Sequence, residues 1–83
     1  MKLIKFSQSA QRELEKLPAT VQKQIEAKLA RYAATGAGDV KALVGEGGAR
    51  LRVGDYRVAF TESENLIAVR AIAHRRDIYR KRK

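Results

Sequence analysis

Cysteine is absent from this chain and histidine occurs only once, at His74. Without cysteine there can be no disulfide bond, thiolate metal site or thiol nucleophile. One imidazole also cannot build the multi-histidine ligand set of a zinc centre. We therefore expect a protein without a metal ion or other cofactor.

Long apolar runs are absent as well. No segment approaches the roughly 20 apolar residues that span a bilayer, and residues 1–6 lack the apolar stretch of a signal peptide. Proline occurs once and glycine six times, against 45% hydrophobic residues, which is typical of a folded chain. We expect one domain over residues 1–83, located in the cytoplasm and not bound to a membrane.

Acidic residues are half as frequent as basic ones. There are 9 Asp and Glu against 18 Lys and Arg, a formal net charge of +9. The excess is +3 (8 − 5) in residues 1–49 and +6 (10 − 4) in residues 50–83. This distribution favours a nucleic acid as partner. The alternatives are a surface that serves solubility or one that binds an acidic protein.

The first half of the chain has a helical pattern after a short strand over residues 2–6. Apolar residues at helical spacing predict an amphipathic helix over 8–16, capped by Ser7 or Ser9. Pro18 then opens a second helix over 18–34, which ends before the glycine-containing loop 35–39. The polar faces of both helices mix charges of both signs, so we interpret the helical hairpin as scaffold.

The second half has a strand pattern. Runs over 50–53 and 56–60 flank Gly54-Asp55, which suits a two-residue type II′ hairpin turn. A third run over 66–73 is apolar nearly throughout, as in a central strand buried on both faces. The glycines of 45–48 form a loop without the lysine and helix of a phosphate-binding loop. The predicted fold is α+β: a short N-terminal strand, a two-helix hairpin, an antiparallel β-sheet and a basic C-terminal segment.

The predicted hairpin brings three arginines together. A two-residue turn pairs Arg52 with Arg57 and Arg50 with Ala59, so all three arginines share the face opposite the apolar residues. Like charges set directly opposite destabilise a sheet by a few tenths to about 1 kcal/mol, and folding alone does not favour them. Phosphate binding explains the arrangement, because guanidinium groups bind phosphate bidentately. The alternative is a polar face that keeps the sheet soluble.

A second basic cluster follows the third strand. Residues 75–83 carry six positive charges and one negative. Tyr79 among these arginines could stack on an RNA base, or it could pack a terminal helix onto the sheet. His74 could act as an acid or base, although a lone histidine at a strand end often has a structural role. Residues 81–83 could equally be a solvated tail.

Residues 50–58, with the sequence RLRVGDYRV, and residues 74–79, with the sequence HRRDIY, resemble the RelE/ParE superfamily of toxins from type II toxin–antitoxin systems, and its RelE branch in particular. The similarity spans almost the whole chain. It implies a metal-free endoribonuclease that cuts mRNA in the ribosomal A site and is inhibited by a cognate antitoxin. In this chemistry the 2′-hydroxyl of the RNA attacks the phosphorus, so no water nucleophile is needed.

The resemblance also implies roles for single residues. Arg50 and Arg52 match basic positions near the scissile phosphate, and Arg57 matches an arginine that stabilises its charge. Arg75 matches a residue implicated in protonating the leaving oxygen, and Tyr79 one that orients the nucleotide. We expect the neighbouring basic residues to bind RNA: Arg76, Arg80 and Lys81.

Two departures from the family pattern affect the mechanism. The best-known pattern has lysines where Arg50 and Arg52 stand, and arginine is a poor base. Either His74 serves as the base or the reaction relies on ribosomal RNA and positioning. The spacing from Arg75 to Tyr79 is also tighter, so Arg76 could be the functional arginine.

Two other functions remain open: inhibition of DNA gyrase by a ParE-like toxin of the same fold, and non-enzymatic binding of RNA or DNA. Whether the toxin is a RelE-like endoribonuclease or a ParE-like gyrase inhibitor, we expect the partner that protects the cell to be a small antitoxin, acidic or amphipathic where it contacts this chain.

Overall fold

The structure is a computed structural model that describes residues 1–42 and 48–76. Its first helix, α1 (Gln8–Glu15), begins where Ser7 caps it: the Ser7 hydroxyl accepts a hydrogen bond from the Ala10 backbone N–H at 3.1 Å. Ala10 and Leu14, one turn apart, are buried. The helix predicted over 8–16 is therefore confirmed, with its last turn one residue shorter.

The second helix, α2 (Ala19–Thr35), follows the N-cap residue Pro18, one residue later than predicted. It buries a stripe of residues four apart, Ile25, Leu29 and Ala33. The helix ends at Gly36, whose left-handed φ of 76° lets its N–H donate to the Tyr32 carbonyl at 2.8 Å. A residue with a Cβ would be strained at that position.

Within residues 1–42 and 48–76, five strands form one sheet in the order β1-β5-β4-β3-β2. The first strand pairs with the last in parallel, and the other three pairings are antiparallel, so the predicted antiparallel sheet gains one parallel edge. A short strand that the sequence pattern did not predict closes the opposite edge. The strands are β1 (Leu3–Phe6), β2 (Val40–Ala42), β3 (Ala49–Val53), β4 (Tyr56–Glu62) and β5 (Leu66–His74).

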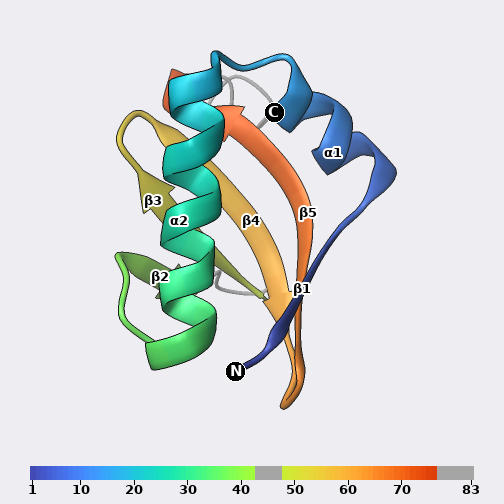
Figure 1. Cartoon of the computed structure of the whole chain (residues 1–83), viewed down its shortest axis with the longest axis vertical. Helices are drawn as coiled ribbons and strands as arrows, with labels where there is room; N and C mark the ends of the chain where they lie inside the picture. The colour runs from blue at the N-terminus through green and yellow to red at the C-terminus, as the bar shows by residue number, and fades with distance from the viewer. Residues whose placement is uncertain (43–47, 77–83) are drawn as a thin grey trace.

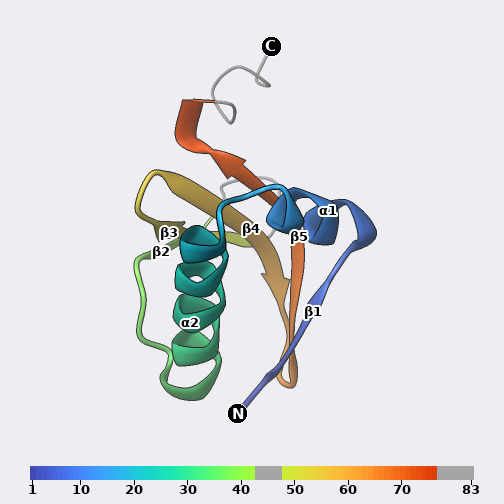
Figure 2. The same cartoon turned by 45° about the horizontal axis from the view of Figure 1, so that its top comes forward.

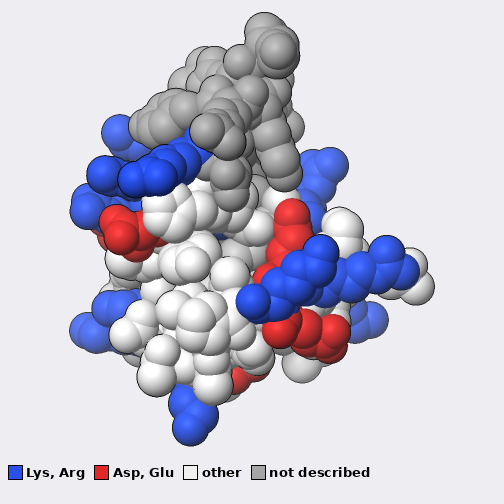
Figure 3. Space-filling view, turned by 90° about the horizontal axis from the view of Figure 1, so that it is seen from above, with Lys and Arg blue, Asp and Glu red and all other residues white. Residues whose placement is uncertain are grey.

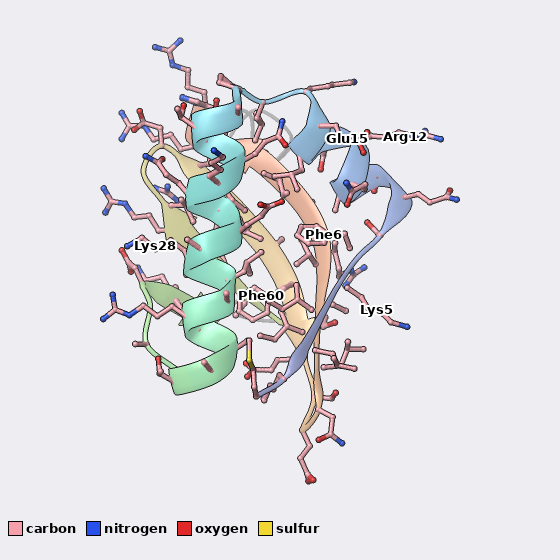
Figure 4. All side chains as sticks on the ribbon, viewed as in Figure 1. Lys5, Phe6, Arg12, Glu15, Lys28 and Phe60 are labelled. Atoms are coloured by element: carbon pink, nitrogen blue, oxygen red, sulfur yellow. The ribbon has the colours of Figure 1, made fainter. Side chains whose placement is uncertain are left out.

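Both helices lie on the same face of the sheet (Figures 1 and 2). Buried side chains of α1 and α2 meet those of β3, β4 and β5 in one core, centred on large residues such as Phe60. In Figure 4, Phe60 lies between α2 and the sheet, whereas Arg12 and Lys5 point outward. No helix within the described residues covers the opposite face, which we call the open face. No helix of this part of the chain is long and apolar enough to cross a membrane.

The interpretation of residues 66–73 as a strand buried on both faces is wrong. β5 does lie between two strands, and its residues Ile67, Val69 and Ile72 are buried against the helices. Its other residues are half-buried or, at Arg70, exposed. The apolar run misled the interpretation because three of the open-face positions, 68, 71 and 73, carry alanine, which is apolar but small enough to remain on a solvated face.

The N-terminal strand is tied to the rest of the fold by one polar network. The Lys2 ammonium donates to one oxygen of Glu62, and the Tyr32 hydroxyl donates to the other at 2.7 Å. Hydrogen bonds from Lys2 and then Tyr32 hold the pKa of Glu62 below its ordinary value. The same hydrogen bond, with partial burial and the Glu62 charge, raises the pKa of Tyr32. The network joins the residue that precedes β1 to α2 and β4.

We predict that Glu62→Gln lowers the free energy of unfolding at pH 7 by up to about 1 kcal/mol, the scale of a surface ion pair. Because the folded pKa of Glu62 is depressed, its contribution is present above the ordinary carboxyl pKa and is lost as the pH falls through the folded value. The difference between wild type and variant should therefore shrink between pH 5 and pH 3 in urea denaturation. Glu64→Gln, in the exposed β4–β5 turn, is the control. A pH-independent difference would contradict the prediction.

Candidate functional site

The β3–β4 hairpin has the predicted turn and register. A type II′ turn requires a positive φ at its first central residue and not at its second. Gly54 has φ 59°, and the φ of Asp55 is not positive. Arg52 pairs with Arg57 and Arg50 with Ala59. The apolar partners on the same strands are buried against the helices, so the three arginines lie on the open face.

The arginines share one surface hollow of about 200 Å³. This volume has room for several water molecules or one phosphodiester group. Four of the lining side chains are cations and one is an anion, a local net charge of +3 (4 − 1). We call this feature the cationic hollow; it is lined by Asp39, Lys41, Arg50, Arg52 and Arg57.

Sequence reasoning missed two members of this hollow, Asp39 and Lys41. Both depend on β2, which pairs antiparallel with β3 and sets Lys41 directly opposite Arg50. The signal was the alternation of Val40, Lys41 and Ala42 after the helical pattern ends, but three residues are a weak strand signal.

Two pairs of like charges face each other across the strands, Arg52 with Arg57 and Lys41 with Arg50. Each such pair destabilises the sheet by a few tenths to about 1 kcal/mol. Among the described residues, the one ion pair in the hollow joins Arg52 Nη1 to Asp39 Oδ2 at 3.9 Å, between side chains 59% and 68% exposed. Such an exposed pair offsets little of the repulsion. A bound phosphate would neutralise the repulsion between the paired cations.

Backbone carbonyls hold one of these side chains, and a backbone hydrogen bond joins two of the strands. The Arg57 guanidinium donates to the carbonyl oxygens of Tyr56 at 3.1 Å and Gly54 at 3.3 Å, within its own turn. The Arg52 backbone N–H donates to the Asp39 carbonyl at 2.9 Å, which joins the start of β2 to β3. The Arg57 guanidinium is thus partly oriented before any ligand arrives.

Alanines continue the open face beside the hollow. Ala59 lies between Arg50 and Ala71 in the strand register, and Ala73 lies beside Arg57. These short side chains leave the face shallow next to its cations. The part of the open face beside the cations is therefore apolar and carries only short side chains.

The structure does not bring His74 into the cationic hollow. His74 pairs with Tyr56, and directly paired residues have their side chains on the same face, which here is the helix side. The two ring centroids are 5.3 Å apart and the ring planes make an angle of 81°, which is an edge-to-face contact. His74 Nδ1 also accepts the Arg76 backbone N–H at 3.3 Å. Its surroundings form a separate, open hollow of about 370 Å³ with Glu13, Lys16, Leu17, Tyr56, Ile72 and Ala73.

Arg75 and Arg76 follow β5 at the same end of the sheet as the hairpin turn. The Arg75 backbone N–H donates to the Asp55 carbonyl at 2.8 Å, and both side chains are exposed. Tyr79, Arg80 and Lys81 lie outside the described residues. Seen from this end in Figure 3, the left margin is mostly basic, whereas basic and acidic side chains are mixed on the right.

The described residues contain no group of three His, Cys, Asp or Glu side chains that could hold a metal ion. The side chains that line the cationic hollow are guanidinium, ammonium and carboxylate groups, which can bind an anion, neutralise developing negative charge and transfer a proton.

The fold is that of RelE-like toxins. A chain of the RelB–RelE antitoxin–toxin complex from Methanococcus jannaschii superimposes with a TM-score of 0.79 at 23% identity, over 95% of this chain and 99% of that one. The isolated RelE toxin of E. coli gives 0.76 at 17% identity, over 96% and 98%. The YoeB dimer of Staphylococcus aureus gives 0.73 at 20% identity, over 88% and 95%.

Residues 4–79 match the sequence model described as the ParE toxin of the type II toxin–antitoxin system, parDE. The chain therefore belongs to the ParE toxin family, and with it to the RelE/ParE superfamily that residues 50–58 and 74–79 indicated. No curated protein sequence gives a significant match.

Proposed function

We propose that this toxin is a metal-independent endoribonuclease that cuts mRNA on the ribosome and so inhibits translation. The observation that carries the proposal is the cationic hollow on the open face, where like charges destabilise the free sheet and a phosphate relieves them. A net charge of +9 supplies the long-range attraction to ribosome and mRNA.

In this mechanism the 2′-hydroxyl attacks the adjacent phosphorus, and the bond to the 5′-oxygen breaks. The products are a 2′,3′-cyclic phosphate and a 5′-hydroxyl. Arg50 and Arg52 hold the phosphate, and Arg57 stabilises its developing charge. Arg75 protonates the leaving oxygen, and Tyr79 orients the nucleotide. Three neighbouring basic side chains bind flanking RNA: Arg76, Arg80 and Lys81.

His74 is not needed as the base in this arrangement, because its ring lies on the helix side of the sheet against Tyr56. We predict that His74→Asn, which retains a hydrogen-bond acceptor for the Arg76 N–H, changes the cleavage rate less than about tenfold, whereas losing a general base costs about 10²- to 10⁴-fold. Single-turnover cleavage at several pH values checks this. A loss of 10²-fold or more, with a changed pH profile, would return His74 to the catalytic site.

Inhibition of DNA gyrase is the second candidate function, favoured by the match to the ParE toxin family. The two candidates separate in one experiment: the chain is induced in cells, mRNA cuts are mapped by primer extension, and plasmid supercoiling is followed in the same cultures. We expect translation-dependent cuts with normal supercoiling. Loss of supercoiling without RNA cuts would reverse the choice, and growth inhibition with neither effect would leave only nucleic-acid binding.

We also propose a cognate antitoxin as partner, as the RelB and YefM complexes of the structural relatives have. Because the exposed toxin surface is basic, the antitoxin should be small and acidic or amphipathic where it binds. Coexpression with the protein encoded by the neighbouring gene should yield a stable complex and restore growth. Harmless expression of the chain alone, with no protein copurifying, would contradict this.

A further inference from the structure

The proposed reaction lacks a base, and the cationic hollow contains a group suited to the task. We propose that Asp39 is the general base that removes the proton from the attacking 2′-hydroxyl. This inference rests on the proposed endoribonuclease function. It starts from an unexpected feature of the hollow: one carboxylate lies among four cations. The four cations alone would bind phosphate more strongly than they do with this carboxylate beside them.

The position of Asp39 is held by the backbone, while its side chain stays accessible. Its carbonyl oxygen accepts the Arg52 N–H at 2.9 Å, so the residue is anchored beside β3 just before β2 begins. Its Oδ2 lies 3.9 Å from Arg52 Nη1, and the side chain is 68% exposed. A phosphate bound between the arginines therefore has a carboxylate close to it that solvent and substrate can reach.

Elimination among the lining residues points the same way. Among the described residues, the other charged groups that line the hollow with Asp39 are Lys41 on β2, Arg50 and Arg52 on β3, and Arg57 on β4. A guanidinium already carries its full set of protons and so cannot accept another, and a lysine ammonium must first lose a proton before it can accept one. A carboxylate at neutral pH accepts a proton directly. Of these five side chains, Asp39 is the one that is already in its basic form.

The step balances without a metal or co-reactant. An Asp39 oxygen takes the proton of the 2′-hydroxyl as the 2′-oxygen forms its bond to phosphorus. The bond from phosphorus to the 5′-oxygen breaks, and that oxygen accepts a proton from Arg75. Arg75 recovers a proton from solvent, and Asp39 releases its own. The neighbouring arginines stabilise both the phosphorane charge and the starting carboxylate.

The test is single-turnover cleavage of mRNA by the purified chain on programmed ribosomes, with Asp39→Asn. The amide keeps the size of the side chain and the backbone contact to Arg52 but cannot accept the proton. We expect the maximal cleavage rate to fall about 10²- to 10⁴-fold. The concentration that gives half-maximal rate should stay the same or decrease, because the variant removes a negative charge from a phosphate site. A residue that only positioned Arg52 would weaken binding when replaced.

The pH profile identifies the base directly. With Asp39 as base, the pH dependence of the rate should change in Asp39→Asn, and the Asp39→Glu variant should restore part of the rate together with the wild-type pH dependence. Asp55→Asn is the matched control, since it makes the same chemical change in the hairpin turn outside the lining of the hollow. That variant should cleave at the wild-type rate.

Three results would overturn the assignment. One is cleavage by Asp39→Asn within about threefold of wild type, and another is an equal loss in the Asp55→Asn control. The third is a wild-type rate that climbs toward alkaline pH and is lost in Lys41→Met, which would make the lysine the base. All three require that the wild-type chain cuts mRNA. If it does not, the proposed function has failed instead, and the two failures remain distinguishable.

Discussion

Arg57→Ala is expected to abolish growth inhibition and to lower the rate of ribosome-dependent mRNA cleavage by at least about 10²-fold, as the loss of one oriented donor to a developing charge does in other enzymes. The guanidinium is held at the hairpin by the carbonyl oxygens of Gly54 and Tyr56 and lines the cationic hollow. Its removal also relieves the repulsion with Arg52, so the fold should not be weakened.

Two further variants make this test specific. Arg57→Lys retains the charge but not the planar fork, and it should cleave at an intermediate rate. Arg70→Ala removes an exposed arginine of β5 that does not line the hollow, and it should remain toxic. Circular dichroism and denaturation confirm that each variant is folded. Undiminished toxicity of Arg57→Ala, or an equal loss in Arg70→Ala, would contradict the proposed site.

Phe60→Ala is expected to have the largest effect on stability, a loss of about 3–5 kcal/mol. Phe60 is 1% exposed, lies in the core between α2 and the sheet, and its ring packs against Tyr32 with the centroids 5.5 Å apart. For a domain of this size the whole free energy of unfolding is about 4–12 kcal/mol. The variant should therefore be largely unfolded at low denaturant concentration or near physiological temperature.

The measurement is the urea midpoint of the wild type, Phe60→Ala and Phe60→Leu, followed by circular dichroism. Leucine refills part of the cavity, so Phe60→Leu should lie between the other two. A fall of less than about 1 kcal/mol for Phe60→Ala would mean that the core is not organised around this ring, and the position of β4 beneath the cationic hollow would need another explanation.

The hairpin arginines could be predicted because local rules determine their placement. A two-residue turn at Gly54-Asp55 sets the register of β3 and β4, and alternation then determines the face of each residue. Both consequences are present in the structure, where Arg52 pairs with Arg57 and three arginines line one hollow.

Asp39 and Lys41 could not be found in the same way. Lys41 lies in β2 and Asp39 directly precedes it, and this strand has only three residues. In the sequence, residues 43–48 separate it from its partner β3, which is too many for a two-residue hairpin turn. Neither the length nor the turn chemistry of that segment specifies a register, so the pairing of Lys41 with Arg50 depends on the tertiary fold.

The face of the sheet on which the His74 side chain lies could also not be predicted from the sequence. Its closeness to Arg75 along the chain suggested one site, but its side chain follows the register of β5 against β4. That register contains a bulge between Ala59 and Phe60, which no turn rule predicts. The outcome is that His74 packs on Tyr56, on the face opposite Arg57.

The central claim is that the cationic hollow directs attack by an RNA 2′-hydroxyl on the ribosome. The most direct measurement is cleavage by the purified wild-type chain of mRNA in programmed ribosomes, with either ribose or 2′-deoxyribose at the one nucleotide where cutting is mapped. We expect the ribose mRNA to be cut with a 2′,3′-cyclic phosphate end and the deoxy mRNA to remain intact at that position. Cleavage of the deoxy mRNA there, or of neither mRNA, would contradict the account.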